Sequence, residues 1–305
     1  MNNLIILTGP TGIGKTEISL NIAEKLNCEI ISCDSMQIYR DLDIGTAKVN
    51  LEDVSIIHHM IDIINPDQEF SVSEFQKLTR DLIASINNKG KLPMLVGGTG
   101  LYINSIVYNL EFANISKDDN YRKRLNQISM DKGSMYLHDK LKELDPREAD
   151  KIHPNNNQRI IRALEIIHSG KVKGKNFRQE NNDYNLAYIA LNMDRQNLYD
   201  RINLRVIDMI NEGLIEETKS AIDKYNLSRD NQSMKAIGYK EVIDYLENIY
   251  TKNSMIEEIQ KNSRHYAKRQ LTWFRRDNRI KWIEKQSPKL LDSILKYIGE
   301  KIERI

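Results

Sequence analysis

Short apolar runs alternate with amphipathic stretches over much of the chain, and this pattern predicts strands alternating with helices. The apolar runs are residues 3–8, 29–33, 94–96 and 186–191. After the first run, Ile18, Ile22 and Leu26 recur every four residues, as one face of a helix requires. Such alternation is typical of an α/β fold with a central, mostly parallel sheet flanked by helices.

The pattern changes between residues 116 and 180. Charged amphipathic helices, such as Tyr121–Gln127 and Gln158–Ile167, replace the alternation, and no convincing buried strand occurs. Gly170–Lys175 reads as a basic, mobile exit from this segment. We therefore expect the first part of the core at residues 1–115, a helical insertion domain at 116–180, and the second part of the core at 181–305.

Composition indicates the cellular environment of the protein more than it indicates the function. The chain has 305 residues, and its 45 basic and 43 acidic residues give a net charge of +2 that neither favours nor excludes an anionic partner. The two cysteines, Cys28 and Cys33, are too few to build a zinc site. We expect no signal-like leader, and no apolar run in the sequence is long enough to cross a membrane. We expect a cytoplasmic monomer without a membrane partner.

The first apolar run leads into a phosphate-binding loop. The pattern G-x-x-x-x-G-K-[ST] is matched at every fixed position by Gly9, Pro10, Thr11, Gly12, Ile13, Gly14, Lys15 and Thr16. Glycines let backbone N–H groups turn toward phosphate oxygens, and the following helix adds positive potential. Lys15 would neutralise phosphate charge, and the Thr16 hydroxyl would ligate Mg²⁺, the expected cofactor. This predicts a P-loop NTPase-like core that holds a diphosphate or nucleotide.

A carboxylate follows the second apolar run. Asp34 and Ser35 come directly after residues 29–33, at the edge of a parallel sheet where substrates lie. Asp34 is therefore a candidate general base, although a carboxylate at a strand end also serves as an N-cap or turn residue. By itself it does not separate a small-molecule kinase from another transferase, since a kinase also orients its acceptor hydroxyl with such a residue.

The third run ends in glycines. Gly97, Gly98 and Gly100 permit close approach of the backbone, and Thr99 offers a hydroxyl at the same sheet edge. Three strand ends would then bring a phosphate cradle, a carboxylate and a hydroxyl into one crevice.

Seven segments in order resemble the bacterial tRNA dimethylallyltransferase family: GPTGIGKT, DSMQIYRDLDIGTAK, HHMIDI, GGTGLY, HPNNNQRIIRALE, AIGYKE and AKRQLTWFRR. The likeness extends from about Leu4 to Ile283. It implies transfer of a dimethylallyl group from dimethylallyl diphosphate to N6 of adenosine 37, beside the anticodon, in tRNAs that read codons beginning with U. The insertion domain would then lie on the anticodon side.

The resemblance gives the candidate residues their roles. Asp34 would accept the proton as adenine N6 attacks, with Thr99 as its catalytic partner, and the P-loop would hold the leaving diphosphate. Arg201 and Arg205, one helical turn apart, either clamp the diphosphate or pair with surface acids. The adjacent His58 and His59 have no third metal ligand at a helpful spacing, which favours a structural role.

Adenosine 37 must leave its stack to react, so the chain needs an RNA-binding surface. Residues 264–285 carry eight Lys or Arg against two acidic residues, interleaved with aromatics, which suits phosphate contact and base stacking. A solvated helix whose aromatics belong to the core would give the same pattern. The resemblance implies tRNA contacts at Asp34, Ser35, Met36, Gln37, Thr99, Arg122, Gln158, Arg159, Ile160, Ile161, Arg162, Lys235, Gly238, Tyr239, Lys268, Arg269 and Arg275. Related proteins usually have a basic residue where this chain has Gln158, so that contact would be weaker.

Three alternatives remain open. A prenyltransferase for free adenine nucleotides shares the mechanism but is typically shorter in the RNA-binding regions. A P-loop kinase for a small molecule would have little use for the basic, aromatic C-terminal stretch. A regulatory, nucleotide-dependent RNA binder would not need Asp34.

Overall fold

The computed structural model describes residues 1–110, 112, 118–170 and 179–302. The chain forms two compact units, one of Met1–Val107 with Glu180–Ile305 and one of Tyr108–Gln179. The boundary expected at residue 116, and all of the expected exit Gly170–Lys175 except Gly170, lie outside the described residues.

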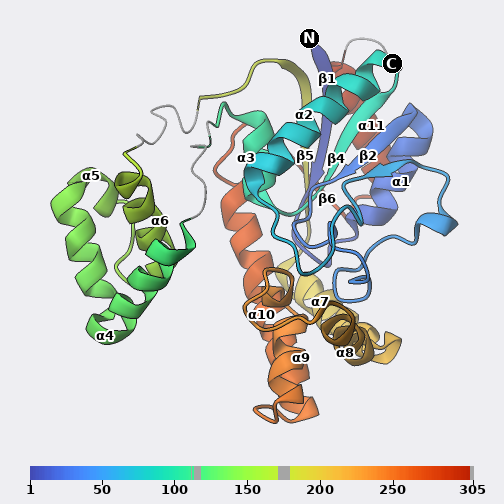
Figure 1. Ribbon diagram of the computed structural model, residues 1–305. Coiled ribbons are helices and arrows are strands. Elements are labelled where there is room, and N and C mark those ends of the chain that lie inside the picture. Colours follow the sequence, from blue (N-terminus) through green and yellow to red (C-terminus); the bar gives the residue numbers. More distant parts are fainter. Residues whose placement is uncertain (111, 113–117, 171–178, 303–305) are drawn as a thin grey trace. The chain divides into compact units, whose positions relative to one another are not determined.

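The first unit is built on a six-stranded sheet with the order β3-β2-β4-β1-β5-β6 (Figure 1). Every neighbouring pair of strands is parallel, which confirms the α/β prediction. All four predicted strands are present. The first, third and fourth extend one or more residues beyond the predicted bounds, and the second is shifted by one residue. The strands are β1 (Asn2–Thr8), β2 (Cys28–Ser32), β3 (His58–His59), β4 (Leu92–Gly97), β5 (Tyr184–Asn192) and β6 (Lys281–Glu284).

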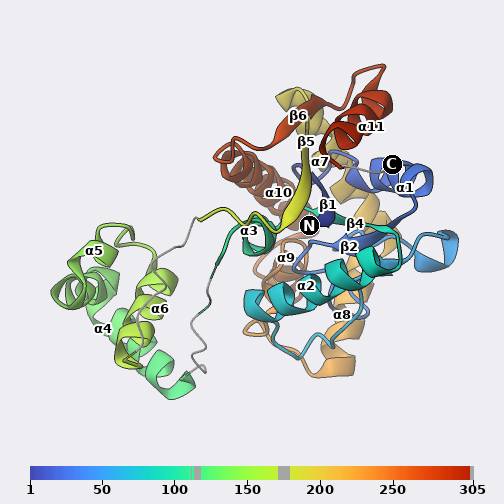
Figure 2. The same cartoon turned by 90° about the horizontal axis from the view of Figure 1, so that it is seen from above.

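Helices cover both faces of this sheet. Helices α1 and α11 pack on one face, where Ile5 and Leu7 of β1 join a core that includes Ile22 and Ile298 (Figure 2). Helix α2 packs against the other face, with Phe75, Ile83 and Ile86 buried. The helices are α1 (Lys15–Leu26), α2 (Val72–Asn88), α3 (Gly100–Val107), α7 (Arg195–Glu212), α8 (Leu214–Tyr225), α9 (Tyr239–Leu246), α10 (Lys252–Phe274) and α11 (Leu290–Lys301), with short 3₁₀ turns at Leu51–Asp53 and Ser233–Lys235.

A layer of helices lies beyond the carboxyl ends of the strands. Helices α7, α8, α9 and part of α10 gather there (Figure 1), and α10 contacts both α7 and α9. This arrangement gives the strand ends a wall and thereby forms the site described below. No helix among the described residues is both long and apolar enough to cross a membrane.

The second unit is helical in its described part. It contains α4 (Asp119–Leu144), α5 (Pro146–Ala149) and α6 (Asn157–His168), and α4 is interrupted by non-helical backbone at Gly133. A separate apolar core, which includes Leu125, Leu137 and Leu164, holds these helices together. The helical insertion expected from the sequence is confirmed.

The basic, aromatic C-terminal stretch is not a single helical element. Helix α10 ends at Phe274, and Trp282 lies in β6, where it pairs in register with Ala190 of β5. Phe274 is 1 % exposed and belongs to the core, so base stacking on its ring is ruled out. Tyr266, which lines the cavities described below, remains a candidate for base stacking.

Candidate functional site

The P-loop connects β1 to α1 in left-handed backbone conformations that favour glycine. Gly12 and Gly14 have φ values of 79° and 90°, and Gly14 is the N-cap of α1. A Cβ at Gly12 would lie 2.8 Å from Ile202 Cγ1, so α7 closes directly over the loop. The Ile13 side chain is fully buried, which leaves only its backbone to face a ligand. The loop therefore presents N–H groups, as an anion site at a helix N-terminus requires.

Lys15 folds back onto the loop. Its Nζ donates hydrogen bonds of 3.0 Å to the carbonyl oxygens of Gly9 and Pro10. Burial, followed by repulsion from the Arg205 guanidinium, lowers its pKa from 10.5 to about 8, against an opposing effect of Asp34. An anion in the cavity would stabilise the charged form of this side chain.

Arg201 and Arg205 reach the loop from α7. Arg201 Nε donates to the Gly12 carbonyl oxygen at 2.9 Å, and an Arg205 guanidinium nitrogen donates to Thr11 Oγ1 at 3.3 Å. Both arginines line the cavity that also contains Lys15 and Thr16. Burial lowers the pKa of Arg205, and the nearby Asp34 carboxylate opposes that effect. Of the two roles left open above, this placement favours a clamp on a diphosphate.

The ends of β2 and β4 bring Asp34 and Thr99 together. Asp34 Oδ1 accepts a 2.9 Å hydrogen bond from Met36 N–H, which is the turn contact that a carboxylate at this position can also make. Thr99 Oγ1 accepts a 3.2 Å hydrogen bond from Ser35 N–H. No hydrogen bond or ion pair within the part of the chain that the structure describes engages Asp34 Oδ2, so this oxygen can accept a proton.

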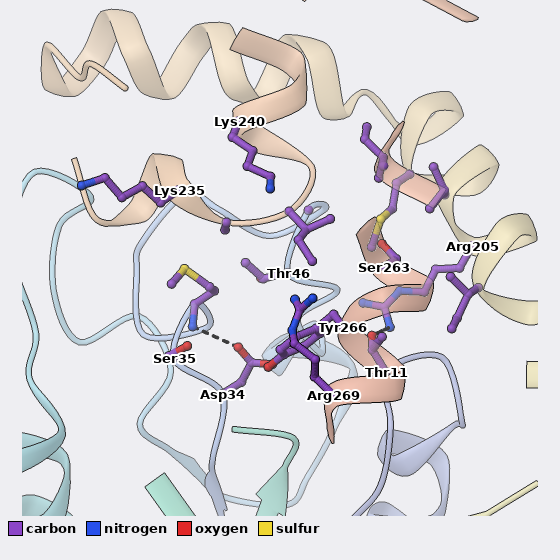
Figure 3. Close-up of a pocket in the computed structure, with 18 residues that line it drawn as sticks. Thr11, Asp34, Ser35, Thr46, Arg205, Lys235, Lys240, Ser263, Tyr266 and Arg269 are labelled. Atoms are coloured by element: carbon purple, nitrogen blue, oxygen red, sulfur yellow. Dashed lines mark hydrogen bonds between the residues drawn. The ribbon is translucent and has the colours of Figure 1, made fainter. Parts of the chain in front are cut away.

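Asp34 lies where two cavities meet. The first, of about 350 Å³, is lined by the P-loop, Arg201 and Arg205. The second, of about 330 Å³, is lined by apolar residues of α7 and by Lys235, Lys240 and Arg269 (Figure 3). Asp34 and Tyr266 line both cavities. The first cavity thus presents the cations Lys15, Arg201 and Arg205 beside the P-loop, together with the carboxylates of Asp34, Asp208 and Glu212. The second cavity shares Asp34 and Tyr266 with it.

Helix α10 has a buried face toward the strand ends and a basic face toward solvent. Tyr266 lines the cavities, and burial together with the nearby Asp34 charge raises its pKa to about 12 against hydrogen bonding with Thr99 and Gln270. Lys268, Arg269 and Arg275 are exposed. This face fits the predicted contact with RNA phosphates.

Several residues expected to contact tRNA instead support the site from within. Gln37 accepts a 2.8 Å hydrogen bond from Ser32 Oγ and donates to the Thr46 carbonyl oxygen at 3.2 Å. Tyr239 is fully buried, and Gly238 beside it is buried as well. The Tyr239 ring packs against Gly45, so this side chain supports the site from within, and the predicted tRNA contact at Tyr239 stays a prediction.

Sequence reasoning missed two residues that brace this site. Gln270 of α10 bonds to the P-loop, and Glu217 of α8 binds the loop around Gly45. The partners of each residue lie far away in the sequence. No local pattern marked these residues, although Gln270 stands within the AKRQLTWFRR segment.

In the second unit, the guanidinium groups of Arg122 and Arg162 are engaged in ion pairs. Both pair with the buried carboxylate of Glu165, and two Arg122 nitrogens each donate to it at 2.8 Å. Ile160 and Ile161 are buried in the core of this unit, so their side chains support the surface rather than line it. Gln158 and Arg159 are exposed on α6.

A metal ion can also be bound by a cluster of side chains without help from a substrate. The described residues contain no group of three or more His, Cys, Asp or Glu side chains that could hold a metal ion. His59 is hydrogen-bonded to the buried Glu29 carboxylate at 2.8 Å, and His58 to the Ile56 carbonyl oxygen at 2.8 Å. Both histidines thus have structural partners.

Comparison with known families gives two overlapping matches. The chain matches the IPP transferase family over residues 37–277 and the isopentenyl transferase family over residues 2–62. The first match covers most of the chain, including β4, β5 and α10. The second covers the P-loop and the Asp34 strand end.

Individual relatives agree with the family matches. The chain is 46% identical over 304 residues to the tRNA dimethylallyltransferase of Bacillus cereus (strain AH187), covering 98% of this chain and 95% of the relative. A crystal structure of the tRNA isopentenylpyrophosphate transferase of Bacillus halodurans has a TM-score of 0.73 at 44% identity, covering 99% of this chain and 98% of that one. A eukaryotic dimethylallyltransferase described as acting on tRNA has a TM-score of 0.80 at 26% identity, covering 97% of this chain and 77% of that one. The chain belongs to the IPP transferase family.

Proposed function

We propose that this protein transfers the dimethylallyl group from dimethylallyl diphosphate to N6 of adenosine 37 in tRNAs that read codons beginning with U. The products are N6-(dimethylallyl)adenosine in tRNA and free diphosphate. Relatives named as tRNA dimethylallyltransferases, matched over nearly their entire length, support this activity.

The observation that carries the proposal is the position of Asp34 between two cavities. The phosphate cavity has Lys15, Arg201 and Arg205 around the P-loop, which suits a diphosphate. The neighbouring cavity has apolar walls and a basic rim, which suits an unstacked base whose backbone phosphates lie outside. A reacting carbon at the junction would lie next to the carboxylate.

The chemistry needs a proton acceptor and a stabilised leaving group. The N6 lone pair forms a bond to C1 of the dimethylallyl group while the bond from C1 to the diphosphate oxygen breaks. Asp34 accepts the proton lost by N6, a contribution of about 10²–10⁴-fold. Lys15, the arginines and the loop N–H groups stabilise the charge that develops on the diphosphate. No covalent intermediate with the protein is required.

The oxygen donors around the P-loop fit Mg²⁺ as the cofactor. Thr16 lines the same cavity as Lys15 and the two arginines, and Mg²⁺ is usually held by one or two protein oxygens together with substrate phosphates and water. When bound, the ion would supply positive charge to the diphosphate oxygens. The scarcity of protein ligands is consistent with a metal that arrives with the diphosphate.

The tRNA would contact exposed residues in both units. In the first unit these are Lys268 and Arg269 on α10, Arg275 directly after it, and Lys235. In the second unit they are Gln158 and Arg159 at the start of α6. The protein would act as a monomer.

An acceptor comparison tests the proposal. The purified protein with Mg²⁺ and radiolabelled dimethylallyl diphosphate is offered unmodified tRNA with adenosine at positions 36 and 37, AMP or ATP. Label in tRNA at adenosine 37 supports the proposal. Label on AMP or ATP instead would indicate a free-nucleotide prenyltransferase, and transfer to no acceptor would return a small-molecule kinase to consideration.

A further inference from the structure

Gln270 joins two loops of the phosphate site to helix α10. Its Oε1 accepts a 2.9 Å hydrogen bond from Thr11 N–H in the P-loop, and its Nε2 donates a 3.0 Å hydrogen bond to the Gly98 carbonyl oxygen. The side chain is 6 % exposed. A single buried amide therefore connects the loop after β1, the loop after β4 and α10.

The amide has one orientation that satisfies both partners. Rotating it by half a turn would place its N–H groups against the Thr11 N–H and its oxygen against the Gly98 carbonyl. Both hydrogen bonds would then be lost, and the buried groups would be left unpaired. The contact is therefore a rigid link between helix and loop.

Two glycines allow α10 to come this close. A Cβ at Gly98 would lie 2.1 Å from Gln270 Nε2, and a Cβ at Gly100 would lie 2.4 Å from Trp273 Cδ1. Real Cβ atoms do not approach other atoms so closely. The glycines after β4 are thus matched to side chains of α10, a relation between residues about 170 positions apart.

The same helix presents its other face to solvent. Lys268 is exposed there, and Arg275 is exposed directly after the helix. Arg269, one residue before Gln270, lines the second cavity, which is called the acceptor cavity from here on. A ligand that restrained these side chains would restrain the helix, and the hydrogen bond from Thr11 to Gln270 would extend that restraint to the P-loop. The reverse follows from thermodynamic reciprocity.

We infer that Gln270 is a positioning residue that couples RNA contact on α10 to the P-loop, so that tRNA and diphosphate each strengthen the binding of the other. The inference rests on the proposed function, since it takes RNA as the ligand of α10 and a diphosphate as the ligand of the loop. It adds to that function a defined link between the two ligands.

The test measures the affinity of the full-length protein for Mg²⁺-pyrophosphate by calorimetry, with and without saturating unmodified tRNA. The variants are Gln270→Met, which keeps the length of the side chain, and Gly98→Ala, which displaces the amide from the opposite side. Thr272→Ala is the matched control, because Thr272 is exposed on α10 and its hydroxyl donates to the Lys268 carbonyl oxygen of the same helix. Thermal unfolding identifies the folded variants, and one folded variant of the two is sufficient.

In the wild type and in Thr272→Ala, tRNA should tighten pyrophosphate binding by about fivefold or more. In Gln270→Met and Gly98→Ala the ratio should fall to about one, while tRNA affinity without pyrophosphate changes by less than about twofold. A ratio of one in the wild type, or an undiminished ratio in a folded variant, overturns the coupling. Failure of the wild type to bind tRNA or pyrophosphate at all would instead overturn the proposed function, and the coupling with it.

Discussion

The Tyr239 hydroxyl donates a 2.7 Å hydrogen bond to Glu217 Oε1, which also accepts a 3.1 Å bond from Gly45 N–H. The other carboxylate oxygen accepts hydrogen bonds from Asp43 N–H at 2.8 Å and Ile44 N–H at 2.7 Å. Gly45 lines the acceptor cavity and Ile44 the phosphate cavity. A carboxylate of α8 and a phenol of α9 therefore hold the loop that borders both cavities.

Replacing Glu217 should loosen that loop. In Glu217→Gln the amide nitrogen cannot accept from backbone N–H groups, so at least one of the four bonds is lost at about 1–3 kcal/mol. We expect kcat/KM for tRNA to fall by about tenfold or more, measured as label transferred from dimethylallyl diphosphate. The exposed neighbour provides the control, and Glu216→Gln should transfer at the wild-type rate. Equal rates for the two variants would remove Glu217 from the account.

Lys15 should make diphosphate binding depend on pH. Its pKa of about 8 in the free protein keeps it protonated below that value and neutral above it. Pyrophosphate affinity should therefore be highest below pH 8 and should fall as pH rises through that value. Calorimetry across this range checks the expectation. Lys15→Met provides the baseline for ionisation of the ligand itself, and an identical pH profile in that variant would contradict the role of Lys15.

The exposed cations of α10 should act on tRNA through phosphate charge. Arg275→Ala should weaken tRNA binding and reduce the magnitude of the salt dependence, the slope of log K against log salt, by about one. Lys296→Ala is a suitable control. Lys296 is also exposed, but it lies on α11, a helix that packs against β5, β6 and α1. Filter binding at several salt concentrations measures both. The same slope for Arg275→Ala and the wild type would place the RNA elsewhere.

Glu165 should stabilise the second unit through Arg122 and Arg162. Burial alone would raise the pKa of this carboxyl, but hydrogen bonds from the two arginines more than offset it and hold the pKa below 4.5. Its contribution is therefore present above that value and lost as pH falls through the lower folded-state pKa. Glu165→Gln should reduce the free energy of unfolding by about 1–3 kcal/mol at neutral pH, measured by urea denaturation. The exposed Glu143→Gln should have no measurable effect, and a similarly stable Glu165→Gln protein would argue against this pairing.

The sequence predicted the sheet, the insertion and the convergence of strand ends better than it predicted the layer around them. The P-loop, Asp34 and Thr99 each follow an apolar run, and parallel strands bring such ends to one edge whatever the details of packing. Local periodicity supplies that information.

The bracing contacts depend on distant parts of the chain. Gln270 and Thr11 are 259 positions apart, and Glu217 and Gly45 are 172 apart. The sequence around Tyr239 gives no sign that Gly45 packs against its ring. Trp282 similarly becomes part of an edge strand only through pairing with β5. Pairings of this kind cannot be read from composition or periodicity.

The most direct test of the central claim compares wild type with Asp34→Asn in a single-turnover assay. Labelled dimethylallyl diphosphate and unmodified tRNA are mixed with excess protein, and tRNA digestion locates the label. We predict label at N6 of adenosine 37 in the wild type and a rate about 10²–10⁴-fold lower in Asp34→Asn, with tRNA retained by both. A rate for Asp34→Asn within a few fold of the wild type would contradict the assignment of Asp34 as the proton acceptor between the two cavities.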